Sequence, residues 1–262
     1  MARDKSMKSP LKRKPLRNPG QALDEEIQRM FEDKVFSYFW FVGGFFVLAI
    51  MEWYGYLTSS PRRPWLFTFA ALVMLAWAAW RIIPLKRHIA GLKQGRDGER
   101  AVGQFLERLR STGAQILHDI PGEDFNLDHV VISERGIFVV ETKTWSKPRP
   151  NAEVQLRNGE MLVEGYKPDR DPVSQVQAQI AWLTRTLEES TGKRFPVRGA
   201  LVFPGWFVDP ELKNAFDGLW ILEPKALPSF IDKEPVRLSR PDVFLVTSRL
   251  SQLVQQKDVG RS

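Results

Sequence analysis

The chain of 262 residues contains no cysteine, and this absence excludes both disulfide bonds and metal sites built from thiolates. Several motifs of other enzyme classes are also missing from the sequence: there is no zinc motif, no phosphate-binding glycine loop and no Ser-His-Asp arrangement. No internal repeat is present. A chain without cysteine suits a cytoplasmic setting, although this absence does not by itself assign a compartment.

Acidic residues are in the minority. The 38 Lys and Arg residues exceed the 31 Asp and Glu residues, which gives a formal net charge of +7 and a pI near 9.7. Such a balance favours an anionic partner, either nucleic acid or a lipid surface. The basic residues near the N-terminus precede apolar runs, so we assign them to the lipid surface. Residues 1–20 are rich in Lys, Arg and Pro, and the basic segment 1–34 is expected to be disordered.

Two runs without a charged side chain lie close together in the first third of the sequence, Val35–Met51 and Trp65–Trp80. With their flanks they predict helices at residues 35–57 and 65–83, each near the roughly 20 residues that cross a bilayer. A buried core helix is the alternative for either run, but two such runs so close together are unusual in a soluble domain. We therefore predict a transmembrane helical hairpin over residues 35–83.

The distribution of Lys and Arg predicts the orientation of this hairpin. Nine of these residues precede the first run and six lie between residues 81 and 100, whereas the connecting loop holds only Arg62 and Arg63. Because basic residues favour the cytoplasmic side, both termini are expected in the cytoplasm. A cleavable secretory signal does not fit, because the polar lead is too long and no small-residue cleavage site follows. The expected location is the inner membrane, in contact with its lipids.

The remaining sequence alternates between helical and extended patterns. A helix is expected to end at Gly113, and further elements follow it: a strand at 114–120, hairpins at 127–143 and 152–163, a helix at 171–190, strands at 197–203 and 243–246, and a short helix at 226–231. The second hairpin turns at Asn158-Gly159. This order predicts an α/β fold with a mixed sheet flanked by helices.

Ionisable side chains stand at one end of the otherwise apolar first hairpin. If the hairpin turns at Arg135-Gly136, Val130 opposes Glu141 and Asp128 opposes Lys143. Residues two apart on a strand share a face, so the two carboxylates and the lysine would gather together. Two interpretations stay open from spacing alone: a solvated sheet edge with a surface salt bridge, or a functional site.

The functional interpretation has a physical basis. Two neighbouring carboxylates repel each other, and a hard divalent cation relieves that repulsion. A ligand set made only of oxygen atoms suits Mg²⁺ or Mn²⁺. Such an ion activates water and neutralises charge that develops on a phosphodiester, while a nearby lysine handles a proton or stabilises the transition state.

Four pieces of sequence occur in a specific order, and each opens or ends a predicted element. They are Gly95-Arg-Asp-Gly98-Glu99-Arg100, Asn126-Leu-Asp128-His129, Gly136-Ile-Phe-Val-Val-Glu141-Thr-Lys143 and Asp171-Pro172-Val-Ser-Gln175. Through them, residues 90–207 resemble the nuclease-related domain family, NERD, of the restriction-endonuclease-like nucleases with an Asp…Glu-x-Lys site. The resemblance implies a restriction-endonuclease-like sheet over this range. Residues 208–262 would then be a C-terminal extension that completes the fold.

The resemblance also implies a role for each motif residue. Asp128 and Glu141 would bind Mg²⁺ or Mn²⁺, and the Thr142 carbonyl would add a ligand. Lys143 would be the general base or would position the attacking water.

Two helical residues join this set by resemblance. Glu99 would lean toward the metal or hold its water, with a charge that complements the helix dipole as the alternative. Gln175 would lie near the site from the later helix. The two histidines of the strands are assigned ordinary roles: His129 is expected to be structural and His118 to be a strand-end residue.

The implied function is metal-dependent hydrolysis of phosphodiester bonds in nucleic acid, with DNA as the expected substrate, at the cytoplasmic face of the membrane. The alternative is a non-catalytic nucleic-acid-binding or adaptor module on the same scaffold. The sequence assigns neither the cleavage pattern nor the oligomeric state.

Overall fold

The computed structural model describes residues 16–58 and 63–260, and its chain divides into two compact units. The helical unit comprises Ala22–Arg96. The sheet unit comprises the chain up to Gln21 together with the residues from Asp97 onward.

The helical unit begins with α1 (Gln21–Met30), which passes through a π-helical turn (Phe31–Val35) into α2 (Phe36–Leu57). The disorder expected for residues 1–34 is therefore wrong from Gln21 onward, and residues 1–15 lie outside the described part of the chain. Ile27 on α1 is buried, and Asp24 accepts a hydrogen bond from Arg96 at 3.0 Å. Packing of an apolar face and this ion pair stabilise a helix that its charged composition alone does not predict.

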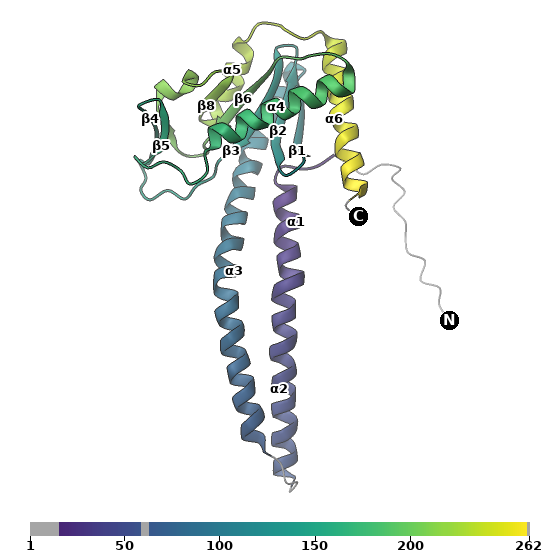
Figure 1. The fold of residues 1–262 in the computed structure, drawn as a ribbon, viewed down its shortest axis with the longest axis vertical. Coiled ribbons are helices and arrows are strands. Elements are labelled where there is room, and N and C mark those ends of the chain that lie inside the picture. The colour runs from purple at the N-terminus through teal and green to yellow at the C-terminus, as the bar shows by residue number, and fades with distance from the viewer. Residues whose placement is uncertain (1–15, 59–62, 261–262) are drawn as a thin grey trace, which may run out of the picture. The chain divides into compact units, whose positions relative to one another are not determined.

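Helix α3 (Pro64–Glu107) runs on through Pro84, so the second predicted span is part of a longer helix. Within the helical unit, α2 and α3 contact each other through Trp53, which donates from Nε1 to Thr68 Oγ1 at 2.9 Å. Tyr38 and Trp77 also meet edge to face, with 5.3 Å between ring centroids. The two helices form the expected hairpin (Figure 1).

The surface of this hairpin is apolar. By length and composition, the helical stretches Gln21–Leu57 and Pro64–Thr112 could each cross a membrane, with hydropathies of 1.7 and 1.9. Only 6% and 11% of their apolar windows are buried. These two values exclude the alternative of a buried core helix for the apolar runs within this structure.

The sheet unit is built on five strands in the order β1-β2-β3-β6-β8 (Figure 1). Their bounds are Gln115–Pro121, Asn126–Ser133, Gly136–Thr142, Val197–Val202 and Leu219–Leu222. Strands β1, β2 and β3 pair antiparallel, whereas β3, β6 and β8 pair parallel. The sheet is therefore mixed, as the sequence predicts.

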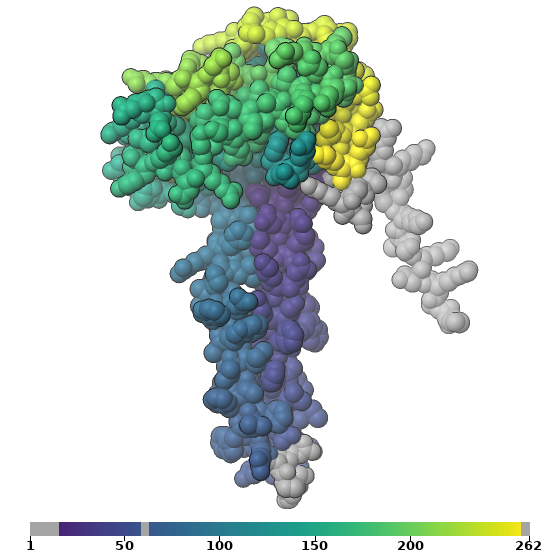
Figure 2. Space-filling view, viewed as in Figure 1, coloured from purple at the N-terminus to yellow at the C-terminus, as the bar shows by residue number. Residues whose placement is uncertain are grey.

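Helices cover both faces of this sheet, which explains why every residue of β3 is buried. Helices α4 (Pro172–Thr191) and α6 (Arg240–Gly260) supply the core on one face, and their surfaces adjoin in Figure 2. The end of α3 and α5 (Leu227–Lys233) supply the core on the opposite face. Short 3₁₀ helices connect these elements at Arg108–Thr112, Pro210–Asn214 and Pro224–Ala226.

The strand expected at residues 243–246 is wrong, because this segment lies inside α6. Its buried residues are Val243, Val246, Leu250 and Val254. Their spacings of three and four residues place them on one helical face, and the β-branched valines are tolerated there because they pack against the sheet.

A second, three-stranded sheet has the order β5-β4-β7. Its strands are β4 (Glu153–Arg157), β5 (Glu160–Val163) and β7 (Phe207–Val208). The hairpin β4–β5 turns at Asn158-Gly159 as predicted, and the φ angles of 52° and 77° are those of a type I′ turn.

The register of the first hairpin differs from the prediction by two residues. Ser133 pairs with Gly136, so the turn is Glu134-Arg135 instead of Arg135-Gly136. The Ser133 hydroxyl accepts a hydrogen bond from the Arg135 amide at 3.2 Å, which stabilises the turn at its observed position. A shift of two residues keeps every side chain on its face, whereas a shift of one would have reversed them.

Candidate functional site

The ends of β2 and β3 bring the predicted acidic residues together. Asp128 lies on β2 and Glu141 on β3, and the pairing of His129 with Val140 places the two carboxylates on neighbouring positions. Asp128 Oδ2 accepts a hydrogen bond from the Thr142 amide at 2.7 Å. Thr142 thus contacts the site through its N–H group, while its expected role as a carbonyl ligand stays a prediction.

Glu141 is only 4% exposed, and side-chain donors surround it. Its Oε1 accepts hydrogen bonds from Lys143 Nζ and from Gln175 Nε2, both at 2.7 Å. Lys143 Nζ also donates to Gln175 Oε1 at 2.8 Å. The structure therefore brings three predicted site residues into one hydrogen-bonded group.

Helix α4 supplies the amide side chains of this group. The helix starts where Asp171 accepts from the Val173 amide at 3.0 Å, with Pro172 in the first turn. From this N-terminus, the side chains of the next turns of α4 reach the end of β3. Gln179, one turn after Gln175, donates to Glu141 Oε2 at 2.7 Å and is 1% exposed.

The sequence interpretation missed Gln179, although a signal was present. Two glutamines four residues apart share a helix face. Gln179 lies on the same buried side of α4 as Val176 and Leu183. A polar side chain among buried apolar positions needs a hydrogen-bond partner, and Glu141 provides it.

Glu99, on α3, interacts electrostatically with Glu141 and Lys143 of this group. A Cβ built on Gly98 would lie 1.7 Å from Thr144 Oγ1, so only glycine allows this helix to approach the segment after Lys143 so closely. Burial raises the pKa of Glu99 to about 8, and the charges of Asp119 and Glu141 add to this rise. A hydrogen bond from the Gly20 backbone acts in the opposite direction.

The pKa of Asp128 is raised by the same two causes, burial and neighbouring carboxylates. Burial raises its pKa well above the usual value, and the charges of Glu141 and then Glu99 raise it further. The Thr142 amide and Lys143 lower it only in part. Three carboxylates therefore lie within one another's electric field in a partly desolvated place.

This arrangement fits a hard divalent cation in its electrostatics and its oxygen donors. Among residues 16–58 and 63–257, whose side chains the structure describes, no group of three or more His, Cys, Asp or Glu side chains has a metal-binding arrangement. A cation would thus be held by Asp128 and Glu141 with water or substrate oxygen completing its shell, as Mg²⁺ commonly is. Oε1 of Glu141 already accepts two hydrogen bonds, whereas Oε2 accepts one from Gln179, so Oε2 keeps a lone pair for a cation.

Asp119 is a second acidic residue that the sequence did not indicate. It is 3% exposed, has φ of 51° and accepts a hydrogen bond from Arg17 at 3.0 Å. Both side chains of this ion pair are almost fully buried. Nearby, Pro19 packs where a Cβ on Gly103 would come within 2.6 Å of its ring. Arg17 and Pro19 thereby hold the segment before α1 against the rest of the sheet unit, near Glu99.

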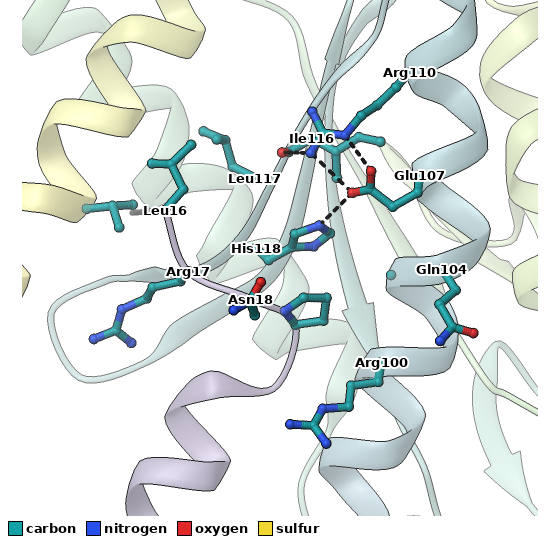
Figure 3. Close-up of a pocket in the computed structure, with 13 residues that line it drawn as sticks. Leu16, Arg17, Asn18, Arg100, Gln104, Glu107, Arg110, Ile116, Leu117 and His118 are labelled. Carbon is teal, nitrogen blue, oxygen red and sulfur yellow. Dashed lines mark hydrogen bonds and ion pairs between the residues drawn. The ribbon is translucent and has the colours of Figure 1, made fainter. Parts of the chain in front are cut away.

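A pocket of about 670 Å³ adjoins this segment and includes His118 (Figure 3). His118 Nε2 lies 3.1 Å from Glu107, and its Nδ1 lies 2.9 Å from Nδ1 of His129. Because two Nδ1 atoms face each other, one ring must donate and the other accept. Burial lowers the pKa of both imidazoles. The two rings form a buried structural pair behind Glu99.

The mixed sheet carries the Asp…Glu-x-Lys cluster at one end, as the resemblance to nuclease-related proteins implies. Residues 94–204 match the family model of the nuclease-related domain, NERD. The match bears out the resemblance to the NERD family over this part of the chain, and placement in the restriction-endonuclease-like superfamily is consistent with it. The matched range contains all four sequence pieces on which the resemblance rests.

One curated relative shares part of the sequence. An uncharacterized protein from Bacillus anthracis is 37% identical over 73 residues, which are 24% of this chain and 34% of that protein. The match thus spans about a third of the relative's length. No solved structure matches this chain.

Proposed function

We propose that this protein is a membrane-anchored nuclease that hydrolyses phosphodiester bonds of DNA with the help of Mg²⁺ or Mn²⁺, at the cytoplasmic face of the inner membrane. The NERD domain supports a nuclease-related function. The observation that carries the proposal is the convergence of Glu141, Lys143 and Gln175 within 2.8 Å, next to Asp128.

The chain's own residues suit this chemistry. Asp128 and Glu141 would bind the cation, which when bound supplies charge neutralisation and activates water. Lys143 leaves the same strand face as Glu141, so its ammonium reaches either a water molecule or a non-bridging phosphate oxygen. Gln175 would hold the lysine in position through the 2.8 Å hydrogen bond to Nζ. Glu99, with its raised pKa, would accept or hold a proton at neutral pH.

Membrane anchoring rests on the helical unit. Its two apolar helices have the length and composition of membrane spans, and their apolar side chains are exposed. In a bilayer, this exposed surface would contact lipid tails instead of water. The basic residues on either side of the spans would then lie near anionic headgroups, each adding about 1 kcal/mol of attraction.

The test uses the full-length protein in detergent micelles with linear, circular and single-stranded DNA and with RNA. We expect cleavage with Mg²⁺ or Mn²⁺ and none in EDTA. Glu141→Ala should abolish cleavage while the protein stays folded, as judged by circular dichroism. Equal cleavage by the parent and by Glu141→Ala would locate the activity elsewhere or in a contaminant.

A non-catalytic nucleic-acid-binding or adaptor role is the second candidate. It is favoured by one observation: hydrogen-bond donors of this chain already occupy both oxygens of Glu141. On this alternative the cluster only stabilises the fold. Metal would then neither stabilise the protein nor promote cleavage, and Glu141→Ala would lower the melting temperature without changing nucleic-acid binding per folded molecule.

A further inference from the structure

A second pocket of the sheet unit opens directly beside Lys143 and Gln175. It has a volume of about 680 Å³, and its other walls come from the segment after β3, the end of β5, the loop before α4 and Trp206. This volume lies in the usual range of about 300–1,000 Å³ for small-ligand sites. Apart from Lys143 and Gln175, the residues that line this pocket have no role in either candidate function.

The most exposed aromatic ring of the pocket belongs to Tyr166, which is 78% exposed. Its backbone is fixed by two hydrogen bonds with Val163, at 2.8 and 3.0 Å. The turn between them has φ angles of 52° at Glu164 and 81° at Gly165, which is the geometry of a tight primed turn. A rigid backbone therefore presents a large ring to solvent, and little entropy is lost when a flat ligand stacks on it.

Two tryptophans form the more buried walls. Trp206 is 3% exposed and donates from Nε1 to the Trp145 carbonyl at 3.2 Å. The Trp145 ring packs against Phe203 with 5.3 Å between centroids. Lys147 lies over the Trp206 ring at 5.9 Å. These contacts hold the aromatic walls in place before any ligand arrives.

Basic side chains line the same pocket. Lys167 and Arg170 are exposed, and Lys143 lies at the boundary with the site. Lys167 forms an ion pair with Glu160 at 2.9 Å, with both side chains more than half exposed. Such surface pairs contribute little to stability, so the lysine can exchange its partner for a phosphate.

We infer that this pocket binds an unpaired nucleotide of a nucleic-acid strand and so selects single-stranded or frayed substrates. The base would stack on Tyr166, and the backbone phosphates would contact Lys167 and Arg170 on the way to Lys143. Aromatic rings combined with basic side chains are the common means of binding single strands without sequence preference. A base inside a duplex is stacked on both sides and cannot enter. This inference rests on the proposed nuclease function and names its substrate class.

The test measures binding of the full-length protein to an oligonucleotide that carries one fluorescent 2-aminopurine in an unpaired overhang, in EDTA and again with Mg²⁺. A blunt duplex of the same length is the comparison. We expect the overhang to bind more tightly than the duplex and its fluorescence to change through stacking. Tyr166→Ala should weaken overhang binding by about fivefold or more, whereas Tyr166→Phe should retain it.

The matched control is Phe244→Ala. Phe244 is 76% exposed on α6 and lines a different pocket, so its truncation should leave binding unchanged. Lys167→Ala and Arg170→Ala should each weaken binding and reduce the dependence on salt, with a change of about 0.7 in the logarithmic slope per lost phosphate contact.

The outcomes separate this inference from the proposed function. Parental overhang preference in Tyr166→Ala, with cleavage intact, would overturn the inference alone. Loss of binding in Tyr166→Ala, with no cleavage by the parent under any metal condition, would support the pocket and overturn hydrolysis. Absence of binding to every oligonucleotide would overturn both. Binding of a proline-rich peptide in place of the oligonucleotide would make this a protein-docking pocket and overturn the inference.

Discussion

Lys143 is the residue on which the proposed chemistry depends most directly. Its Nζ lies 2.7 Å from Glu141 and 2.8 Å from Gln175, so its position is determined by two different elements. A lysine that only neutralised a neighbouring carboxylate would have the same short contact with Glu141. An experiment that substitutes Lys143 must therefore distinguish a loss of catalysis from a loss of folded protein.

We predict that Lys143→Ala lowers the rate of DNA cleavage by about 10²- to 10⁴-fold, the usual contribution of a general acid–base group. Metal and DNA binding should persist. Lys143→Arg keeps the charge but does not readily release a proton, so it should be active only if charge stabilisation is the role. Single-turnover rates normalised to folded protein provide the measurement. Parental normalised activity in Lys143→Ala would show that Lys143 is not catalytic.

Glu99 gives the site a predicted dependence on pH. Its pKa rises from 4.5 to about 8 in the folded protein, mainly through burial. Between these two values the folded state holds a proton that the unfolded state has lost, so the stability of the metal-free protein should fall as the pH rises across this window. Mg²⁺ competes with these protons, and its stabilising effect should therefore grow with pH.

Melting temperatures between pH 5 and 8, with and without Mg²⁺, test this dependence. Glu99→Gln should flatten the pH profile of the metal-free protein, since the amide does not titrate. Asp128 shifts in the same direction, so a residual slope should remain. A metal-free stability that increases steadily from pH 5 to 8 would contradict the burial of ionisable carboxyl groups.

At the scale of secondary-structure elements, one close approach and one ion pair fix the surroundings of the site. Gly98 lets α3 meet Thr144, and Arg17 joins the segment before α1 to Asp119 on β1. Both contacts link parts of the chain that are far apart in sequence. They hold Glu99 from two sides, because Gly98 precedes it and Gly20 donates to it.

Gly98→Ala should lower the free energy of unfolding by about 1–3 kcal/mol, because the added methyl group overpacks the contact with Thr144. Mg²⁺ stabilisation should weaken at the same time, since Glu99 shifts with the helix. Gly91→Ala is the control. A Cβ on Gly91 meets no atom within 4 Å, so this change should be neutral or slightly stabilising. Urea denaturation compares the two variants, and equal stabilities would show that the close approach is unimportant.

Arg17→Met should destabilise the sheet unit by about 3–5 kcal/mol, because it removes the positive charge that is paired with the buried Asp119 carboxylate. The double variant Arg17→Met/Asp119→Asn should recover much of this loss. Arg185→Ala is a matched control, since its pair with Glu123 is exposed and should contribute about 1 kcal/mol or less. A loss in Arg17→Met no larger than that in Arg185→Ala would argue against a structural role for the buried pair.

At the scale of the whole molecule, the proposal joins a nuclease-related domain to a membrane hairpin in one chain. An anchor of this kind would restrict the enzyme to nucleic acid that comes near the membrane. The basic residues before and after the two spans would determine its orientation, since the connecting loop carries only Arg62 and Arg63.

We predict that both termini are cytoplasmic. A reporter that is active only in the cytoplasm should function when fused to either end of the chain, and one inserted in the loop between the spans should not. A C-terminal reporter that functions only outside the cytoplasm would reverse the topology. It would also separate the nuclease-related domain from cytoplasmic DNA, and so would contradict the proposed location.

The sequence by itself determined the features that follow from local rules. Asp171 and Gly192 delimit α4, and Asn158-Gly159 forms the turn of the β4–β5 hairpin. The two uncharged runs are helical. All three features were predictable because helix capping, turn geometry and hydrophobicity act over a few residues. The shared face of Asp128 and Glu141 was also predictable, since a register shift of two residues conserves it.

Only the tertiary structure decided the rest. It placed Val243–Val246 in a helix, turned the first hairpin at Glu134-Arg135, and brought Gln179 to Glu141 and Arg17 to Asp119. Each of these outcomes depends on packing or hydrogen bonds between segments that are distant in the chain, and at the hairpin turn these are the bonds that the Glu134 carbonyl accepts from the Arg237 and Leu238 amides. In these segments the intrinsic preferences for helix, strand or a given turn differ by less free energy than is gained from burial and from pairing buried polar groups. The tertiary contacts therefore determine which conformation forms.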